Sequence, residues 1–273
     1  MTIFFKKFEP KRLRKLILKM AFNGQAVHIG CAFSIVEILA VLYRRFLEYP
    51  GNDPNSINRD FLVLSKGHGV MAQYACLHEL GWVTDEMIAN YFADGSILNG
   101  LSDSRIDGLE VTSGSLGHGF SVGVGIAYGL TRLNKSQKVY VLVGDGELNE
   151  GAIWEGAMFA SQHKLSNLIV IVDENSFQAM GETENILNLG STSRKFESFG
   201  FEVKEVDGHN ESQLENTISK MIEENNPLPK VIIAKTVKGK GVNFMEGDNK
   251  WHYTRLNDKT YKDALDYLNG PVL

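Results

Sequence analysis

The chain has 273 residues, of which 43% are hydrophobic and 22% charged, values typical of a folded globular protein rather than a disordered one. Its formal net charge of −5 argues against a nucleic-acid-binding surface spread over the fold. The only cysteines, Cys31 and Cys76, exclude a disulfide framework or a thiolate metal site. No stretch is long enough for a membrane span, and the first eight residues do not resemble a signal peptide. We therefore expect a cytoplasmic protein that acts on small molecules.

The amino-terminal region predicts two helices. The first covers residues 10–22, where Pro10 suits a first turn and apolar residues recur at helical spacing. Its basic residues fall on the other face, which favours a solvated helix over a membrane-surface helix. The second covers residues 34–46, with Ser34 as N-cap and Glu37 completing a capping box.

From residue 61 onward the pattern alternates between strands and helices. Unbroken apolar runs at 139–143 and 168–172 are typical of strands buried on both faces, as in a parallel sheet covered by helices. Shorter strands are predicted at 61–64, 201–206 and 231–234. Helices are predicted to end at Leu80 and Thr131 and to span 147–163 and 210–223. No linker or repeat interrupts the series, so we expect a single doubly wound α/β domain over residues 1–273, with a mostly parallel sheet flanked by helices.

Two neighbouring strand ends carry metal-binding chemistry. Gly144-Asp145-Gly146 follows the strand at 139–143, and its glycines allow a tight turn before a helix N-terminus that favours anions. A carboxylate at Asp145 would repel a bare phosphate unless it held a cation that also bound the phosphate. Asn175 follows the next strand, and Mg²⁺ prefers such oxygen ligands together with phosphate oxygens. The spacing predicts a Mg²⁺–diphosphate site built from Asp145, Asn175 and one loop carbonyl.

Together with three further motifs, this pair resembles the transketolase family of thiamine diphosphate enzymes. The motifs are Leu64-Ser65-Lys66-Gly67-His68, Thr112-Ser113-Gly114-Ser115-Leu116-Gly117, and Val237-Lys238-Gly239-Lys240-Gly241 leading to Trp251-His252. They occur in the family's order across residues 23–252. The resemblance covers nearly the whole chain but only the first of the family's three domains, the one that binds the diphosphate.

The resemblance implies a role for each matching position. Catalytic roles fall on His28, His68 and His252. Cofactor contacts fall on His68, Gly114, Ser115, Leu116, Gly144, Gly146, Glu150, Lys238 and His252, and metal contacts on Asp145, Asn175 and the Phe177 carbonyl. Glu150 and Glu155 match acidic positions near the family's subunit contact, or simply place negative charge near a helix N-terminus.

The sequence gives less reason to assign a functional role to the remaining histidines. His118 stands where the family often has Gln, and it is either a supporting contact or a loop residue. His78, His163 and His209 match no ligand pattern and are expected to be structural.

Two departures from the family pattern affect function. Leu101 replaces a histidine that contacts the donor sugar in many transketolases, and an unpaired buried hydroxyl would cost about 1–3 kcal/mol, so we expect a different donor preference. The glutamate that activates thiamine diphosphate lies in the family's middle domain, which has no counterpart in this sequence. We therefore expect a separate C-terminal subunit that carries the pyrimidine-binding domain and this glutamate, with two copies of each chain in a heterotetramer.

These expectations converge on the N-terminal subunit of a split transketolase. With its partner it would use thiamine diphosphate and Mg²⁺ to move a two-carbon ketol unit from a ketose or ketose phosphate to an aldose. The alternatives are half of another thiamine diphosphate enzyme, of the 2-oxo-acid decarboxylase, dehydrogenase E1 or 1-deoxysugar synthase type, and a non-catalytic scaffold subunit.

Overall fold

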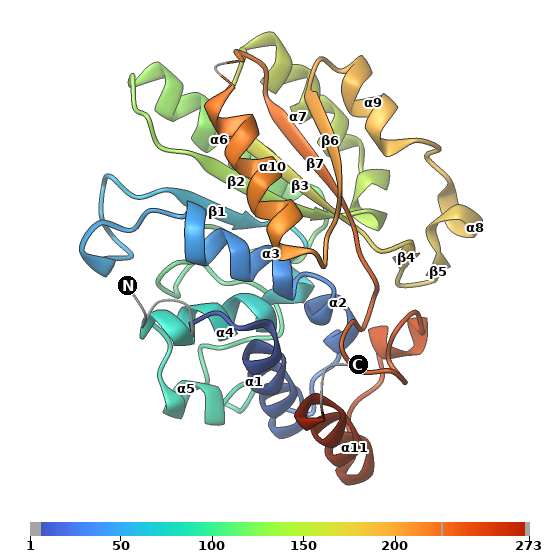
Figure 1. The fold of residues 1–273 in the computed structure, drawn as a ribbon. Helices are drawn as coiled ribbons and strands as arrows, with labels where there is room; N and C mark the ends of the chain where they lie inside the picture. The colour runs from blue at the N-terminus through green and yellow to red at the C-terminus, as the bar shows by residue number, and fades with distance from the viewer. Residues whose placement is uncertain (1–6, 225, 271–273) are drawn as a thin grey trace.

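The fold is organised around a five-stranded parallel sheet with the strand order β1-β2-β3-β7-β6 (Figure 1). A computed structural model describes residues 7–224 and 226–270. The expectation about a signal peptide concerns the first eight residues, of which residues 1–6 lie outside these ranges. The strands are β1 (Phe61–Leu64), β2 (Val139–Gly144), β3 (Leu168–Glu174), β6 (Glu202–Asp207) and β7 (Lys230–Lys235). A short antiparallel pair, β4 (Phe177–Gln178) and β5 (Gly181–Glu182), follows β3.

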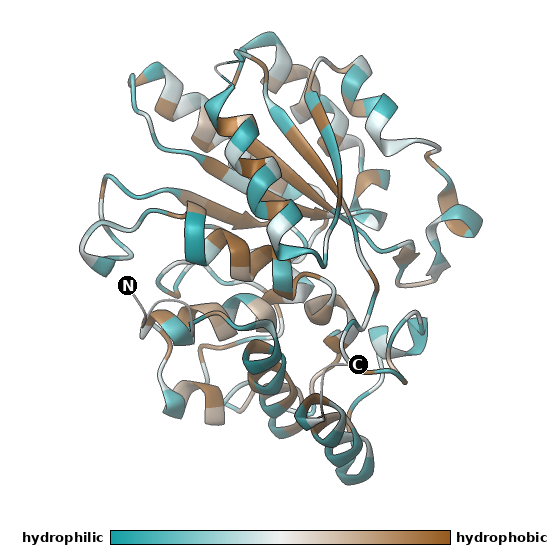
Figure 2. Cartoon of the chain, viewed as in Figure 1, coloured by the Kyte–Doolittle hydropathy of each residue, from teal (hydrophilic) through white to brown (hydrophobic). Residues whose placement is uncertain are grey.

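The central strands are apolar on both faces because helices cover both sides of the sheet. In β2, Tyr140 and Leu142 enter one hydrophobic core, whereas Val139, Val141 and Val143 enter the other. The side chains of β3 alternate in the same way. Figure 2 shows these strands as the hydrophobic centre of the sheet, with helices packed against them. The doubly wound α/β prediction is therefore confirmed.

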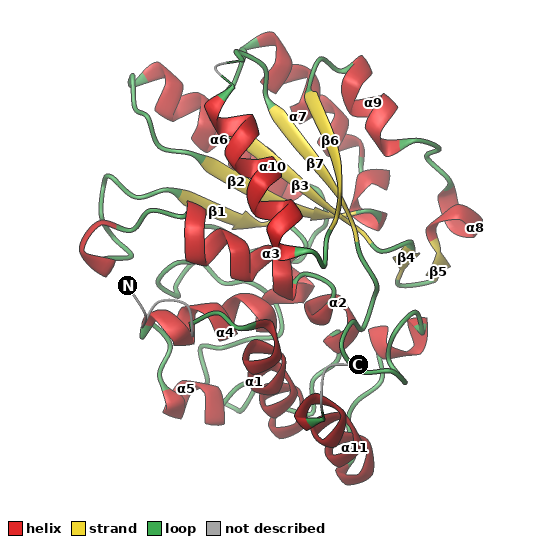
Figure 3. Cartoon of the chain, in the orientation of Figure 1, coloured by secondary structure: helices red, strands yellow, loops and turns green. Residues whose placement is uncertain are grey.

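Figure 3 marks the helices, which divide between the two hydrophobic cores. One core receives side chains from α1 (Pro10–Asn23), α2 (Ile29–Phe33), α3 (Val36–Val41), α4 (Val70–Leu80), α5 (Asp85–Ala89), α10 (Glu211–Glu223) and α11 (Asp258–Asn269). The other core receives them from α6 (His118–Arg132), α7 (Gly151–Gln162) and α9 (Thr192–Ser198). A further helix, α8 (Thr183–Leu187), follows the β4–β5 pair. Among the residues described, none of these helices combines the length and apolar character needed to cross a membrane.

Most predicted elements are confirmed to within two residues, but the predicted helix at 34–46 is wrong at its start. Ser34 ends α2 instead of capping the next helix, and its hydroxyl donates a hydrogen bond to Asp173 at 2.8 Å, with the Cys31 carbonyl 3.2 Å away. Glu37 forms a buried ion pair with Arg14. Both side chains of the supposed capping box therefore bond to distant partners, and the chain continues from α3 as a π-helix at Leu42–Phe46.

The helix predicted at 147–163 also begins later than expected. Residues Gly146–Asn149 form a 3₁₀ turn, and Glu150 is extended before α7 starts at Gly151. In this 3₁₀ turn the buried Glu147 carboxylate accepts hydrogen bonds from the backbone N–H groups of Gly117, before α6, and Gly144, at the end of β2. The short elements β4, β5, α5, α8 and α9, and the terminal helix α11, were not predicted.

Two glycines of α6 give a matched test of this packing. A Cβ at Gly119 would lie 2.7 Å from the Ser65 Cα, whereas a Cβ at Gly125 would meet nothing within 4 Å. We expect Gly119→Ala to lower the free energy of unfolding by about 1–3 kcal/mol, because the backbone at the end of β1 must move. Gly125→Ala should raise it by up to about 1 kcal/mol through helix propensity. Urea unfolding of both variants measures this, and equal effects would contradict the assigned contact.

Candidate active site

The carboxyl ends of β1, β2, β3 and β7 meet at one edge of the sheet, beside a cavity of about 470 Å³. Nearly all the predicted site residues line this cavity: His28, His68, Leu101, Gly114, Leu116, Gly144, Asp145, Gly146, Glu150, Asn175, Phe177 and His252. Ser115 is exposed and does not line it. Lys238 lies behind His252, to which its ammonium donates a hydrogen bond.

Asp145 and Asn175 lie on adjacent strand ends because Gly144 pairs with Asp173 in the sheet register. One carboxylate oxygen of Asp145 accepts from the Gly146 N–H at 2.8 Å, and the other accepts from the Ser176 N–H at 2.6 Å. The Asn175 amide oxygen accepts from the Phe177 N–H at 3.1 Å. These bonds fix the orientation of both side chains, and each oxygen keeps a second lone pair.

The charge at Asp145 suits a cation. Burial, reinforced by the nearby Asp173 carboxylate, raises the pKa of Asp145 to about 7. Within residues 7–224 and 226–270 no lysine, arginine or histidine forms an ion pair with it, because the nearby Lys66 pairs with Asp173. A divalent cation would supply the missing compensation, and a carboxylate beside an amide oxygen is a donor set that Mg²⁺ accepts.

Asp173 is the most heavily bonded side chain at this edge. It is fully buried and accepts hydrogen bonds from Ser34, Lys66, Asn175 and Thr236. Burial alone would raise the pKa of its carboxyl, but the Lys66 ammonium and the hydrogen bonds from Lys66, Thr236 and Ser34 together lower it. Sequence reasoning missed this residue, although its position two residues before Asn175 at the end of a buried strand was a usable signal.

Glu147 holds the loop at residues 112–117, the glycine-rich loop, against the turn after β2. Its buried carboxylate accepts from the Gly117 N–H at 2.8 Å, from the Gly144 N–H at 3.1 Å and from the Ser65 hydroxyl. The two loops that carry predicted cofactor contacts therefore share one acceptor. Sequence reasoning also missed Glu147, which it counted only as the first residue of a helix.

The three predicted catalytic histidines form one cluster. The ring centroids are 5.4 Å apart for His28–His68, 5.1 Å for His28–His252 and 5.7 Å for His68–His252. Burial, and secondly the positive charge of Lys238, lowers the pKa of His28 to about 4 and that of His252 to about 3. Burial and then Lys66 lower the pKa of His68 well below its ordinary value. All three imidazoles are therefore neutral at pH 7.

Lys238 sets the tautomer of His252. Its ammonium is buried and donates to the His252 Nδ1 at 2.8 Å and to the Asn249 side-chain oxygen at 2.6 Å. Because Nδ1 accepts, the proton of the neutral ring must lie on Nε2. His252 can then donate a hydrogen bond from Nε2, while its backbone carbonyl accepts from the His28 N–H at 2.8 Å.

The other residues considered from sequence lie elsewhere or have local roles. His118 is exposed and its ring contacts the Leu116 carbonyl at 3.3 Å. Glu155 is exposed on α7, and His78 contacts Asp85. Leu101 is 40% exposed at the cavity wall, so it presents an apolar surface to whatever enters.

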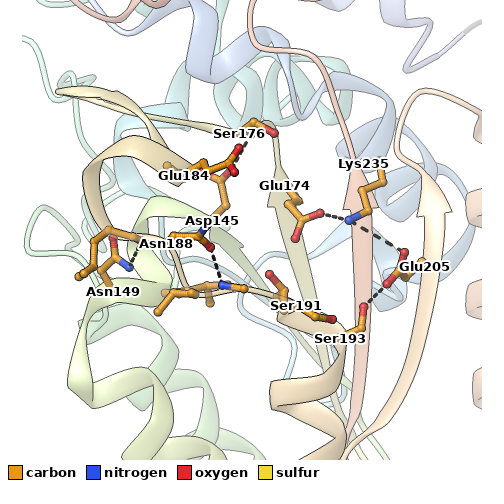
Figure 4. A pocket seen from close by; sticks show the side chains of 16 residues that line it. Asp145, Asn149, Glu174, Ser176, Glu184, Asn188, Ser191, Ser193, Glu205 and Lys235 are labelled. Atoms are coloured by element: carbon orange, nitrogen blue, oxygen red, sulfur yellow. Dashed lines mark hydrogen bonds and ion pairs between the residues drawn. The ribbon is translucent and has the colours of Figure 1, made fainter.

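A second, polar pocket of about 260 Å³ shares Asp145 with the larger cavity (Figure 4). Its wall includes Lys235, which bonds to Glu174 and also lies 3.9 Å from Glu205. Glu205 in turn accepts from the Ser193 hydroxyl. The lysine is therefore engaged with carboxylates, and the pocket presents no unpaired cation among its described residues.

The buried neutral state of His252 predicts a pH effect on stability. The unfolded chain binds a proton at this imidazole near pH 6.5, whereas the folded chain does so only near pH 3. The unfolded state therefore holds more protons in that window, so stability falls as the pH falls, by up to about 1.4 kcal/mol per pH unit. His252→Asn removes this effect, so any deficit in the variant's unfolding free energy should shrink between pH 7 and pH 5.

Urea unfolding at several pH values measures that difference. His163→Asn, at an exposed position, is the control and should keep the pH slope of the wild-type chain. A constant difference between wild type and His252→Asn across the range would contradict the assignment of a buried neutral ring.

Comparisons with known proteins agree with this geometry. The family model described as "Transketolase, thiamine diphosphate binding domain" matches residues 11–268. The chain is 37% identical to an apulose-4-phosphate transketolase subunit of Phocaeicola vulgatus over 95% of its length and 92% of the relative. It is also 37% identical to a 6-deoxy-6-sulfo-D-fructose transketolase subunit of a Clostridium species, over 94% and 93% of the two chains.

A solved transketolase from Leishmania mexicana superposes with a TM-score of 0.90 at 28% identity. The match covers 95% of this chain and 40% of the solved one, so this chain corresponds to a part of that protein. The matched family model spans all the motifs that carry the predicted site. The chain belongs to the transketolase family of transferases.

Proposed function

We propose that this chain is the N-terminal, cofactor-binding subunit of a split transketolase. It would bind thiamine diphosphate and Mg²⁺ as a single domain over residues 1–273 and act in the cytoplasm with a separate C-terminal subunit, two copies of each. The complex would transfer a two-carbon ketol unit from a ketose or ketose phosphate to an aldose.

The pairing of Asp145 with Asn175 carries the proposal. Their oxygens lie on adjacent strand ends, held by backbone N–H groups, and the buried Asp145 charge is matched by no cation of the described chain. These two side chains and the Phe177 carbonyl would hold Mg²⁺, and Gly146 at the turn would approach the diphosphate. A Cβ at Gly146 would lie 3.1 Å from Gln178, so a larger residue would crowd this turn.

The histidine cluster supports proton handling at the reaction centre. When bound, thiamine diphosphate supplies the carbon nucleophile that takes up and releases the ketol unit. Neutral imidazoles can both accept and donate a proton at pH 7, as general acid–base chemistry on sugar hydroxyls requires. His252 offers an Nε2–H donor because Lys238 engages its Nδ1. The mutual closeness of the three rings would let them act on one substrate.

Some relatives are themselves transketolase subunits, which supports the proposal that this chain works with a partner subunit. Their names also suggest a range of substrates. One is named for apulose 4-phosphate and another for 6-deoxy-6-sulfo-D-fructose, and both have equal identity to this chain. Leu101 at the cavity wall cannot hydrogen-bond a donor hydroxyl, which favours a donor other than the common pentose phosphates. We therefore propose a ketose donor, phosphorylated or otherwise modified, with an aldose acceptor.

Reconstitution tests this function. The purified chain is mixed with thiamine diphosphate, Mg²⁺ and a candidate C-terminal transketolase subunit, the product of a neighbouring gene, and ketose donors are compared with hydroxypyruvate and pyruvate. We expect ketol transfer only when both chains are present. Transfer by this chain alone would refute the split-subunit proposal, decarboxylation of pyruvate would favour the alternative reactions, and no Mg²⁺-dependent cofactor binding would favour a scaffold.

Removing the Asp145 carboxylate should abolish Mg²⁺-dependent cofactor binding. In Asp145→Ala the metal loses the one anionic side chain among its proposed ligands, while two phosphate charges remain beside it. Calorimetric titration of thiamine diphosphate in the presence of Mg²⁺ should show no measurable heat of binding. Asp263→Ala, at an exposed carboxylate on α11, is the control and should bind as the wild type does. Unchanged affinity in Asp145→Ala would contradict the metal assignment.

A further inference from the structure

The loop that carries Lys238 is held at two backbone positions by side chains from outside the cavity. The Val237 N–H donates to the His209 Nε2 at 2.8 Å, and the Lys240 carbonyl accepts from the Arg14 Nε at 2.7 Å. These two positions flank Lys238. Neither Arg14 nor His209 lines the cavity beside the strand ends.

A third side chain, Glu37, joins the two anchors. Its carboxylate accepts from the Arg14 guanidinium at 2.6 and 2.8 Å and contacts the His209 Nδ1 at 2.9 Å. The Arg14 guanidinium also donates to the Phe33 carbonyl at 3.1 Å. Burial opposes the charge of Glu37, but the hydrogen bond from His209 and the charge and hydrogen bonds of Arg14 lower its pKa to about 2. The carboxylate is therefore ionised and bonded on both sides.

The backbone brings His209 to this position. The turn after β6 lies against the end of β7, where the Gly208 N–H donates to the Lys235 carbonyl at 2.8 Å. A Cβ at Gly208 would lie 2.4 Å from the Thr236 side chain, so the close approach requires glycine there. Because the His209 Nε2 accepts from Val237, the ring is neutral and its Nδ1–H donates to Glu37.

The anchored loop in turn fixes Lys238 against His252. The Gly239 N–H donates to the Gly30 carbonyl at 3.0 Å, near His28, so the loop is tied to the histidine cluster on that side. The Lys238 Nζ must reach the His252 Nδ1 at 2.8 Å to place the proton of that ring on Nε2. A shift of the loop backbone would break this bond, and the proton of the His252 ring would then no longer be confined to Nε2.

We propose that His209 is a positioning residue for the active site, which acts through the Val237 N–H to hold Lys238 against His252, with Arg14 and Glu37 bracing the same loop. The inference rests on the proposed function for its effect on turnover, whereas its effect on the His252 tautomer is independent of that function. Other roles for His209, as a surface or purely folding residue, predict no link to His252.

Two substitutions at position 209 distinguish the hydrogen bond that Nε2 makes with Val237 from the one that Nδ1 makes with Glu37. A Gln side chain can place an acceptor where Nε2 lies, so His209→Gln keeps the bond to Val237. An Asn side chain reaches only as far as Nδ1, so His209→Asn keeps the contact with Glu37 and loses the bond to Val237. Gln213→Ala is the matched control, because it removes another acceptor of the same turn, from the Asp207 N–H, without touching the Val237–Lys240 loop.

The first measurement is the ¹⁵N spectrum of the histidine-labelled full chain, in which His252→Asn identifies the His252 signals. We expect the Nε2–H tautomer in the wild type, His209→Gln and Gln213→Ala, and a mixture of tautomers in His209→Asn. The second is ketol transfer by the reconstituted complex, where kcat of His209→Asn should fall by roughly 10- to 100-fold with a smaller change in KM. His209→Gln and Gln213→Ala should keep most of the wild-type kcat.

An unchanged His252 spectrum in His209→Asn, or equal losses in His209→Asn and His209→Gln, would overturn the proposal. If His209→Asn does not fold, His209→Gln still decides, because loss of the Nε2–H tautomer in that folded variant also contradicts it. Failure of the wild-type complex to transfer a ketol unit would contradict the proposed function instead and would leave the spectroscopic result standing.

Discussion

The site depends on the buried ion pair between Lys66 and Asp173. Lys66 follows β1 and Asp173 lies near the end of β3, and both side chains are almost fully buried. Asp173 also accepts from Ser34 and Thr236, so one carboxylate joins the ends of β1, β3 and β7 to the end of α2. Removing one partner of such a pair leaves an uncompensated buried charge, which typically costs about 3–5 kcal/mol. The edge of the sheet that carries the proposed chemistry is therefore held together by polar bonds.

The ion pair between Lys66 and Asp173 also determines which charged side chains at the cavity are left without an oppositely charged partner among the described residues. Because Lys66 is engaged with Asp173, the Asp145 carboxylate keeps a raised pKa and a charge that a bound cation can compensate. On the opposite side, Lys238 donates to two neutral groups, His252 and Asn249, so its positive charge stays beside the histidine cluster. The cavity thus has a negative side that suits a metal and a positive side that adds to burial in keeping the histidine rings neutral.

Three buried carboxylates each join segments that are far apart in the sequence. Asp173 joins strand ends, Glu147 joins the glycine-rich loop to the turn after β2, and Glu37 joins α1 to the turn after β6. In each case a neutral or cationic donor lies on a segment far along the chain. Hydrogen bonds to charged groups are strong in a low-dielectric interior, and a missing partner is costly there. The loops around the cavity are for this reason specified by polar contacts as much as by apolar packing.

The sequence by itself determined the parallel sheet, the edge that carries the site and most of the residues that line the cavity. Unbroken apolar runs such as 139–143 report burial on both faces, and Asp145 and Asn175 follow successive strands, so topology alone brings them together. Only the tertiary structure decided the partners of the buried polar groups. Ser34 bonds to Asp173, 139 positions away, and Glu37 to His209, 172 positions away. A helix cap is worth about 1 kcal/mol, so these stronger buried bonds displaced the locally predicted capping box, and no local pattern records where such distant partners lie.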